Sequence, residues 1–277
     1  MIQYQTLLRY ILKYGVEKPS GRDNMPNTLS VFGYQMMFDL QDGFPLVTTK
    51  YVSFKNIVVE LLWFLRGDDN IKYLVDNNCN IWNEDAYRFY IKLCENQDIH
   101  DRLSFDDFAS SIKNPDYQTF HNLPSDYRLG DTGEQYPVLW RHYEGHIDQT
   151  ANLIDGLKNN PHSRRHIITA WNPNTLDDMA LPACHSFVQF YVRDGYLDCQ
   201  LYQRSGDLIL GCPYNIASYS LLTHILAEIC DLEPGRFIHT LGDVHIYTNH
   251  IEAAKEQSHR TPKDLPELAI EYNFKEF

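Results

Sequence analysis

The stretch from Ser186 to Arg204 reads SFVQFYVRDGYLDCQLYQR, and it gives the clearest indication of how this chain folds. Two runs rich in aromatic and β-branched residues flank the dipeptide Asp194-Gly195. Such a dipeptide between strand-like runs is a strong signal for a two-residue β-hairpin turn. We therefore predict an antiparallel hairpin here and place the other elements outward from it.

The segments around the hairpin alternate between helical and strand-like patterns. Towards the C-terminus we predict a largely apolar helix at 216–230, a strand at 236–247 and a helix at 249–258. Towards the N-terminus we predict a helix at 148–159 and a strand at 166–172. The order has no repeating βαβ rhythm, so it favours an α+β fold with an antiparallel or mixed sheet.

The first 80 residues add further elements of both kinds. Apolar residues at helical spacing predict a helix at 2–14, and residues 28–40 are typical of a strand with a kink or bulge at Gly33. Ser53 could cap a helix that ends near Gly67, and a second helix is expected at 70–77. Residues 83–135 are polar and aromatic with weak periodicity, and we interpret them as a peripheral insert within one domain spanning 1–277.

Composition excludes several classes of protein. The chain has 277 residues, is 43% hydrophobic and carries a net charge of −13, so it is neither disordered nor suited to nonspecific binding of nucleic acid or anionic membranes. It contains no apolar run of membrane-spanning length and no signal peptide at 1–18. Six cysteines without close pairing indicate reduced thiols in a cytoplasmic protein, and no metal site is expected.

Two residues stand out as chemically reactive candidates. Glu60 lies in the apolar run IVVELLWFL, where a buried carboxylate is unfavourable unless it is paired or used, although it could also occupy a solvated helix face. Cys184 lies in LPACHSF beside His185 and could be a nucleophile if a positive charge lowers its pKa. A cysteine next to a histidine is more often structural.

Further polar residues could bind an anion or a base. Arg164, Arg165 and Arg204 suit phosphate oxygens, although surface ion pairs are the simpler explanation for each alone. Asn215 could be a helix N-cap or could pair with an amide-like edge. His245 and Tyr247 are two residues apart on a predicted strand, so they face the same side.

Considered together, these segments resemble the thymidylate synthase superfamily. The resemblance rests on PACHSFVQFYV, LYQRSGDLILGCPYNIASY and GDVHIYTNH, with GFPLVTTK, ELLWFLRGDDNI, IW and SRRHI in the same order. It covers about 3–82 and 136–270. It implies a thymidylate synthase-like fold, a mixed β-sheet flanked by helices, and a homodimer formed sheet to sheet with shared active sites.

The resemblance implies a nucleotide site for dUMP. Cys184 would add to C6 of the base, Glu60 would manage protons, and Asn215 would read the uracil edge, which favours dUMP over dCMP. Arg204 would bind phosphate and favour the thiolate, and Tyr136 would lie near the proton at C5. The remaining nucleotide-binding residues implied by the resemblance are Arg22, Arg164, Arg165, His185, Gln203, Ser205, Asp207, His245 and Tyr247.

The resemblance also implies a folate site for the co-substrate 5,10-methylenetetrahydrofolate. The residues expected to line it are Ile81, Trp82, Asp207, Leu210, Gly211 and Tyr214. Three departures from the family pattern concern this site. Asp85 stands near the usual position of a second tryptophan, Pro137 and Leu139 replace Gly and Gln, and the sequence ends at FKEF without the family's closing tail.

These departures bear on the last chemical step. If the folate clamp is weak, water rather than hydride captures the exocyclic methylene, so we predict a dUMP hydroxymethylase that forms 5-hydroxymethyl-dUMP. The first alternative is a thymidylate synthase that forms dTMP and dihydrofolate. A non-catalytic nucleotide-binding protein is the third hypothesis, but it has no need of Cys184. For a phage or viral protein the expected location is the host cytoplasm.

Overall fold

The computed structural model describes residues 1–22, 24–114 and 127–271. The chain forms two compact units. The first, here called the sheet unit, comprises Met1–Phe54, Leu153–Ile167 and Cys184–Phe277. The second, the helical unit, comprises Lys55–Asn152 and Ile168–Ala183. Whether the chain functions as one domain with a peripheral insert stays a prediction.

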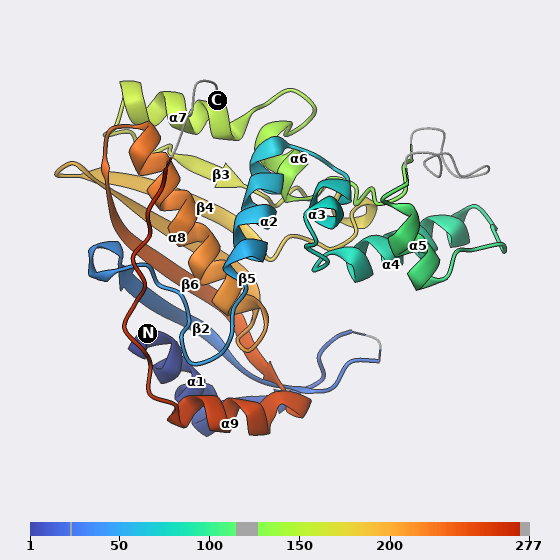
Figure 1. Ribbon diagram of the computed structural model, residues 1–277, viewed down its shortest axis with the longest axis horizontal. Coiled ribbons are helices and arrows are strands. Elements are labelled where there is room, and N and C mark those ends of the chain that lie inside the picture. Colours follow the sequence, from blue (N-terminus) through green and yellow to red (C-terminus); the bar gives the residue numbers. More distant parts are fainter. Residues whose placement is uncertain (23, 115–126, 272–277) are drawn as a thin grey trace. The chain divides into compact units, whose positions relative to one another are not determined.

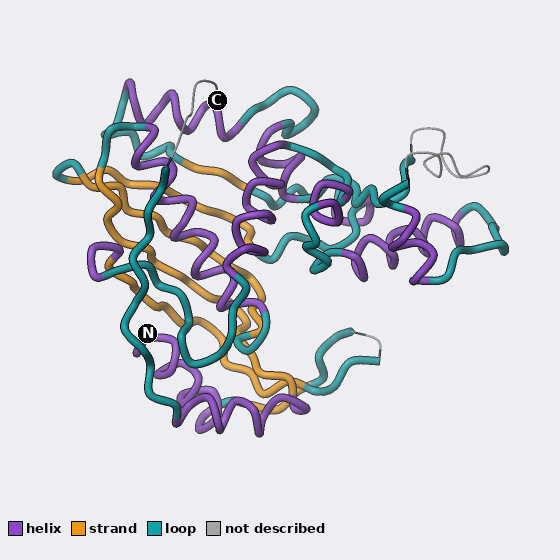
Figure 2. The backbone as a smooth tube through the Cα atoms, in the orientation of Figure 1, coloured by secondary structure: helices purple, strands orange, loops and turns teal. Residues whose placement is uncertain are grey.

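A six-stranded sheet is the main feature of the fold, with strand order β1-β2-β6-β5-β4-β3 (Figures 1 and 2). The pairs β1–β2, β2–β6 and β4–β5 are antiparallel, whereas β5–β6 is parallel. The predicted α+β class with a mixed sheet is therefore confirmed. The strands are β1 (Val16–Lys18), β2 (Thr28–Asp39), β3 (Ile167–Thr169), β4 (His185–Arg193), β5 (Tyr196–Asp207) and β6 (Glu233–Tyr247).

Two local strand predictions are confirmed in detail. Arg193 pairs with Tyr196 across the predicted turn, whose residues Asp194 and Gly195 have φ of 48° and 82°. Positive φ at both positions is typical of a type I′ hairpin turn. Gly33 also has a positive φ of 76°. The β2–β6 register is the same on both sides of it, so Gly33 distorts the strand without inserting a residue.

Four helices belong wholly or partly to the sheet unit: α1 (Ile2–Tyr14), α7 (Gln149–Asn159), α8 (Gly211–Ile229) and α9 (Ile251–His259). Helix α8 packs on β5 and β6, and α1 packs on β2 and α9 (Figure 1). Helix α8 begins at Gly211 rather than at 216 as predicted, because Asp207 Oδ1 accepts hydrogen bonds from the main-chain nitrogens of Ile209 and Leu210. Pro213 fits the first turn, where its missing N–H is not needed.

The helical unit contains α2 (Phe54–Arg66) except for its first residue, and all of α3 (Lys72–Asp76), α4 (Asn83–Asn96), α5 (Phe105–Ser111) and α6 (Tyr136–Arg141). Helix α2 begins directly after Ser53 and ends beside Gly67, as predicted, and α3 is shorter than predicted. Helices α4 and α5 were not predicted. They pack through the rings of Tyr87, Tyr90 and Phe108. Within the insert, residues 115–126 lie outside the described residues. Short 3-10 helices are found at Leu40–Asp42, Leu176–Asp178 and Thr248–His250.

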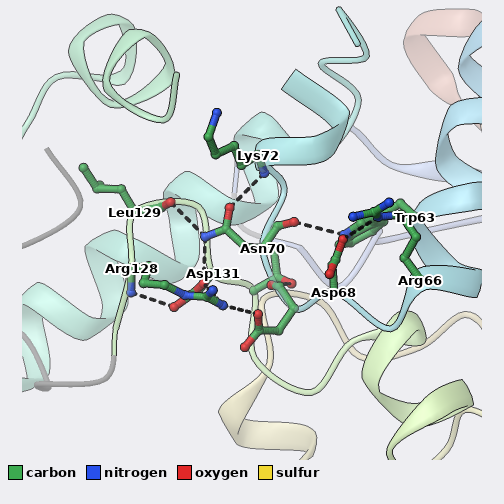
Figure 3. Close-up of polar contacts among 10 residues, drawn as sticks. Trp63, Arg66, Asp68, Asn70, Lys72, Arg128, Leu129 and Asp131 are labelled. Atoms are coloured by element: carbon green, nitrogen blue, oxygen red, sulfur yellow. Dashed lines mark hydrogen bonds and ion pairs between the residues drawn. The ribbon is translucent and has the colours of Figure 1, made fainter. Parts of the chain in front are cut away.

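Asn70 ties the end of the insert to the turn after α2 (Figure 3). Its Nδ2 donates to the carbonyl of Leu129 at 2.9 Å and to Asp131 Oδ1 at 2.7 Å, and its Oδ1 accepts from the nitrogen of Lys72 at 2.8 Å. Trp63, on α2, donates from Nε1 to the Asn70 carbonyl at 3.0 Å. Asn70 thus connects the end of the insert, through hydrogen bonds, to the helix that carries Glu60.

Candidate active site

Cys184 lies directly before β4 and is half-buried. Its carbonyl accepts a hydrogen bond from the nitrogen of Arg204 at 2.9 Å and from Ser186 Oγ at 3.2 Å. The β4–β5 register shifts between His185 and Phe187. Bulges of this kind re-aim side chains next to functional sites. The irregularity therefore sets the direction in which the strand presents the residues beside the thiol.

A chain of buried and part-buried hydrogen bonds runs from β6 through β5 to α8 and β4. His239 Nε2 lies 2.8 Å from Gln203 Oε1, and Gln203 Nε2 donates to Asn215 Oδ1 at 3.0 Å. Asn215 Nδ2 lies 2.8 Å from His185 Nε2. Gln203 Nε2 also donates to the carbonyl of Ser205 at 2.9 Å. Here the structure brings together Gln203, Asn215 and His185, which the sequence assigned to the nucleotide site.

The two histidines of this hydrogen-bond chain, His185 and His239, are held neutral. Burial lowers the pKa of His185 to about 3, and burial together with the nearby His185 lowers the pKa of His239 to about 3. A neutral imidazole has one donor and one acceptor nitrogen. Because Gln203 Oε1 can only accept, His239 donates from Nε2, and because Asn215 Nδ2 can only donate, His185 accepts at Nε2.

His245 and Tyr247 share one face of β6, as predicted, with ring centroids 5.3 Å apart. His245 Nδ1 lies 3.1 Å from Asp243 Oδ1, which also accepts from Ser30 Oγ at 2.7 Å. Lys18 pairs with the other carboxylate oxygen. The hydrogen bond from His245, together with those from Lys18 and Ser30, lowers the pKa of Asp243 far below its usual range, so Asp243 is an ionised anchor that orients the His245 ring.

Charges from several predicted site residues act on the Tyr247 hydroxyl. Burial raises the pKa of Tyr247, the charge of Arg22 opposes this, and the charges of Asp207 and Cys184 add to it. Coulombic effects of this kind fall off with distance. Asp207, on β5, pairs with His245, two residues before Tyr247 on β6, so Asp207 and Tyr247 belong to the same end of the sheet unit.

The remaining arginines differ in their surroundings. Arg204, on β5, is half-buried, and its main chain is hydrogen-bonded to Cys184. Arg164 and Arg165 are exposed, and within the described part of the chain their guanidinium groups make no hydrogen bond or ion pair. The carbonyl of Arg164 accepts from Gln189 Nε2 at 3.2 Å, which fixes this segment beside β4.

Glu60 is buried in the helical unit, which rules out the solvated-face interpretation. Burial raises its pKa to about 7, and the hydrogen bond from Trp82 Nε1 to its Oε1 at 2.8 Å opposes the rise. The Trp82 ring lies edge-on to Trp63 and Tyr136. A carboxyl with a pKa near neutrality can both accept and release a proton, as a general acid–base group requires.

The residues predicted to line the folate site have varied exposure. Ile81 and Leu210 are 41% and 52% exposed, whereas Trp82 is almost completely buried. Tyr214 accepts from the nitrogen of Ser53 at 3.4 Å, and Gly211 is the first residue of α8. Asp85 forms an ion pair with Arg88.

The other two departures are only partly described. Pro137 and Leu139 are buried in α6. The end of the sequence, FKEF, lies outside the described residues.

One charged hollow was missed in the sequence analysis. A cavity of about 620 Å³ in the sheet unit is lined by Thr48, Thr49, Lys50, Tyr51, Arg260, Thr261 and Lys263. Lys50 Nζ donates to the carbonyl of Ile209 at 2.8 Å, and burial lowers the Lys50 pKa. Three cationic side chains around one hollow suit an anionic ligand. Because Lys50 is more than 200 positions from Arg260 and Lys263, sequence spacing could not bring the three together.

The described part of the chain has neither a candidate metal cluster nor a candidate membrane span. Residues 1–22, 24–114 and 127–271 contain no cluster of three or more His, Cys, Asp or Glu side chains that could hold a metal ion. No helix in the same residues has both the length and the apolar character needed to cross a membrane. All six cysteines are free thiols.

Comparison with known proteins identifies the family. The family model described as thymidylate synthase matches residues 2–277. A thymidylate synthase from Listeria monocytogenes serotype 4a is 48% identical over 284 residues, covering 98% of this chain and 90% of that protein. Thymidylate synthases from Mycoplasma pneumoniae and Staphylococcus haemolyticus are also 48% identical, each covering 98% of this chain and 89% of their own. The chain belongs to the thymidylate synthase family and is a one-carbon transferase.

These relatives bear on the predicted product. They are named thymidylate synthases, so they support the first alternative of the sequence analysis rather than its main prediction of a hydroxymethylase. Identity of 48% extends over nearly the whole chain despite Asp85, Pro137 and Leu139. Those three residues alone were therefore insufficient grounds for a change of product.

Proposed function

We propose that the protein catalyses the reductive methylation of dUMP to dTMP, with 5,10-methylenetetrahydrofolate as the co-substrate and dihydrofolate as the second product. The observation that carries this proposal is the near full-length similarity to proteins named thymidylate synthase. The polar chain through Gln203, Asn215 and His185 supports it, because it provides a buried reader for a pyrimidine edge.

In this proposal Cys184 is the nucleophile. Its thiolate adds to C6 of uracil, and the electron pair of the C5–C6 bond moves towards C5 and O4. The C5 carbon then attacks the one-carbon unit of the folate, which neutral uracil cannot do. Loss of the C5 proton and cleavage of the bond between the one-carbon unit and the folate nitrogen release tetrahydrofolate and leave an exocyclic methylene on C5. Hydride transfer from tetrahydrofolate to this methylene gives the methyl group and dihydrofolate, and loss of the thiolate from C6 restores the C5–C6 double bond. Arg204 stabilises the thiolate and binds the phosphate.

Asn215 is proposed to read the base. Its Oδ1 has accepted one hydrogen bond from Gln203, and its Nδ2 has donated one to His185. One acceptor position on Oδ1 and one donor hydrogen on Nδ2 remain. Uracil presents the matching N3–H donor and O4 acceptor, whereas cytosine presents the opposite pattern. This count favours dUMP over dCMP.

The other side chains are proposed to bind the rest of the nucleotide and move protons. His245, oriented by Asp243, and Tyr247 would bind the deoxyribose hydroxyl. Glu60 would exchange protons at O4 through water, since its pKa of about 7 lets it act in both directions. Tyr136 would assist removal of the C5 proton. Ser205 and Arg22 would join the phosphate site.

The folate is proposed to bind along Ile81, Trp82, Asp207, Leu210, Gly211 and Tyr214. Its glutamate tail carries carboxylates at neutral pH. The cationic hollow that contains Lys50, Arg260 and Lys263 is suited to those carboxylates. Lys263→Glu should therefore raise the KM for the folate more than the KM for dUMP.

A homodimer is proposed to complete the phosphate site with Arg164 and Arg165 of the second copy. The sheet face that carries Met37, Phe187, Tyr191 and Tyr202 exposes these large side chains by 39–61%. A face of this kind is suited to burial against a second copy.

We also propose that the protein acts in the cytoplasm, because its six cysteines are free thiols.

The oligomeric state can be measured directly. Sedimentation equilibrium should give twice the 32.5 kDa chain mass, and Tyr191→Lys should give a monomer. Purely monomeric wild-type protein at micromolar concentration contradicts the dimer.

The product assay decides the reaction. Incubation with dUMP and methylenetetrahydrofolate should yield dTMP by mass spectrometry, with one dihydrofolate formed per dTMP. If 5-hydroxymethyl-dUMP and tetrahydrofolate form instead, water captures the methylene and the proposal of reduction is wrong. If neither nucleotide forms and 5-fluoro-dUMP gives no covalent adduct, the protein only binds nucleotide.

A further inference from the structure

A carboxamide that reads a pyrimidine edge is nearly symmetric in shape but opposite in polarity at its two ends. If the Asn215 amide turns by 180°, its oxygen and nitrogen exchange places, and the pattern that suits uracil becomes one that suits cytosine. The orientation of this amide therefore decides which base is accepted. Residues that hold the orientation determine specificity without touching the base.

The orientation originates at a group that cannot reverse. The carbonyl of Ser205 has no hydrogen to donate, so Gln203 must present its NH₂ group there, at 2.9 Å. The same Nε2 then donates to Asn215 Oδ1 at 3.0 Å, which directs Asn215 Nδ2 to His185. At this end of Gln203, one main-chain acceptor on β5 favours the orientation that both amides adopt.

His239 fixes the other end of Gln203. Its Nε2 donates to Gln203 Oε1 at 2.8 Å, and the imidazole is fully buried. Without this donor, the Gln203 oxygen would lose its partner in a buried position. A buried acceptor without a partner is costly, so Gln203 would rotate or draw in water, and its hold on Asn215 would weaken.

We propose that His239 is a positioning residue that sets the preference for uracil over cytosine, acting through Gln203 on the orientation of the Asn215 amide. His239 contacts Gln203 rather than Asn215, and it has no direct role in the chemistry. The inference rests on the proposed function, because it takes dUMP as the nucleotide.

A comparison of dUMP and dCMP binding in four proteins tests this role of His239. Competition equilibrium dialysis gives the ratio of their dissociation constants for the wild type, His239→Leu, His239→Gln and Phe237→Leu. Loss of the donor in His239→Leu should reduce the preference for dUMP by about tenfold or more, because one buried hydrogen bond no longer fixes the amide. His239→Gln, whose Nε2 can donate from a similar position, should keep the ratio within about threefold of wild type.

Phe237→Leu separates packing from hydrogen bonding. Phe237 is fully buried on the same strand, and its ring lies 5.5 Å from that of His239, so its loss weakens the packing but leaves the donor. Its preference for dUMP should equal that of the wild type. An unchanged ratio in His239→Leu, or an equal fall in Phe237→Leu, overturns the proposal.

A second measurement needs no variant and no turnover. Nitrogen-15 chemical shifts of the histidine rings should show His239 as the Nε2–H tautomer in wild-type protein with dUMP bound. An Nδ1–H tautomer overturns the inference even if His239→Leu fails to fold. If the wild type does not bind dUMP at all, the proposed function fails and this inference fails with it. If dUMP binds and the ratio does not move, only this inference fails.

Discussion

Replacing Glu60 with glutamine tests whether the buried carboxyl has a raised pKa that lets it exchange protons near neutral pH. Glu60 accepts a hydrogen bond from Trp82 Nε1, and the Oε1 of a glutamine can accept the same bond. The two side chains are nearly identical in size. Glu60→Gln therefore changes the protonation behaviour of this position and leaves its packing almost unchanged.

The magnitude follows from the pKa. Burial moves the pKa of Glu60 from 4.5 to about 7, which corresponds to about 3 kcal/mol of folding free energy. Below pH 4.5 the carboxyl is protonated in the folded and unfolded states. As the pH rises from 4.5 to 7, the unfolded chain ionises first, so the wild type loses stability progressively until the folded carboxyl also ionises. The glutamine variant has no such loss.

Urea unfolding at a series of pH values from 4.5 to 8.5 measures this difference. The free energy of unfolding of Glu60→Gln minus that of the wild type should increase by about 3 kcal/mol over this range and then level off. Other titrating groups contribute equally to both proteins and cancel. The variant should also lose most of its turnover of dUMP. A stability difference that is constant with pH, or that falls as the pH rises, would refute the reasoning.

Three further variants test other features. Cys184→Ser should form no covalent adduct with 5-fluoro-dUMP and methylenetetrahydrofolate, while its dissociation constant for dUMP stays within about threefold of wild type, and an adduct seen by mass spectrometry would remove Cys184 as the nucleophile. Asn215→Asp should shift the preference from dUMP towards dCMP by about tenfold or more, and an unchanged ratio in competition assays would remove Asn215 as the base reader. Gly195→Ala should lower the free energy of unfolding by about 1 kcal/mol, because the residue has φ of 82° with open space around it, and an unchanged urea midpoint would contradict the turn.

The elements with local sequence signals were predicted well. The hairpin was found because positive φ at Asp194 and Gly195 depends on turn chemistry within two residues. Helix α1 was found because its buried residues repeat at helical spacing. Helices α4 and α5 were missed because they are amphipathic through scattered tyrosine and phenylalanine rings rather than through an aliphatic stripe.

The candidate site was predictable in its side chains but not in its main chain. The resemblance to the family located Cys184, Gln203 and Asn215 from motifs. The orienting carbonyl of Ser205 has no sequence signature, because every residue offers the same main-chain acceptor whatever its side chain. His239 was missed because a lone histidine on a strand gives no indication of its hydrogen-bond partner. For Glu60 the sequence left burial undecided, and only the packing around α2 settled it.

The long-range pairing of β2 with β6 has a consequence for synthesis of the chain. Thr28 pairs with Tyr247, so β2 leaves the ribosome well before its central partner exists. At 5–20 residues per second, this delay is roughly 10 to 40 seconds. During this delay, one edge of β2 has no partner strand from its own chain. Unpaired edges of this kind are templates for association with other chains. The pairs that β6 makes with β2 and β5 therefore form last. Yield during expression should depend on how well β2 is kept from other nascent chains until β6 is synthesised.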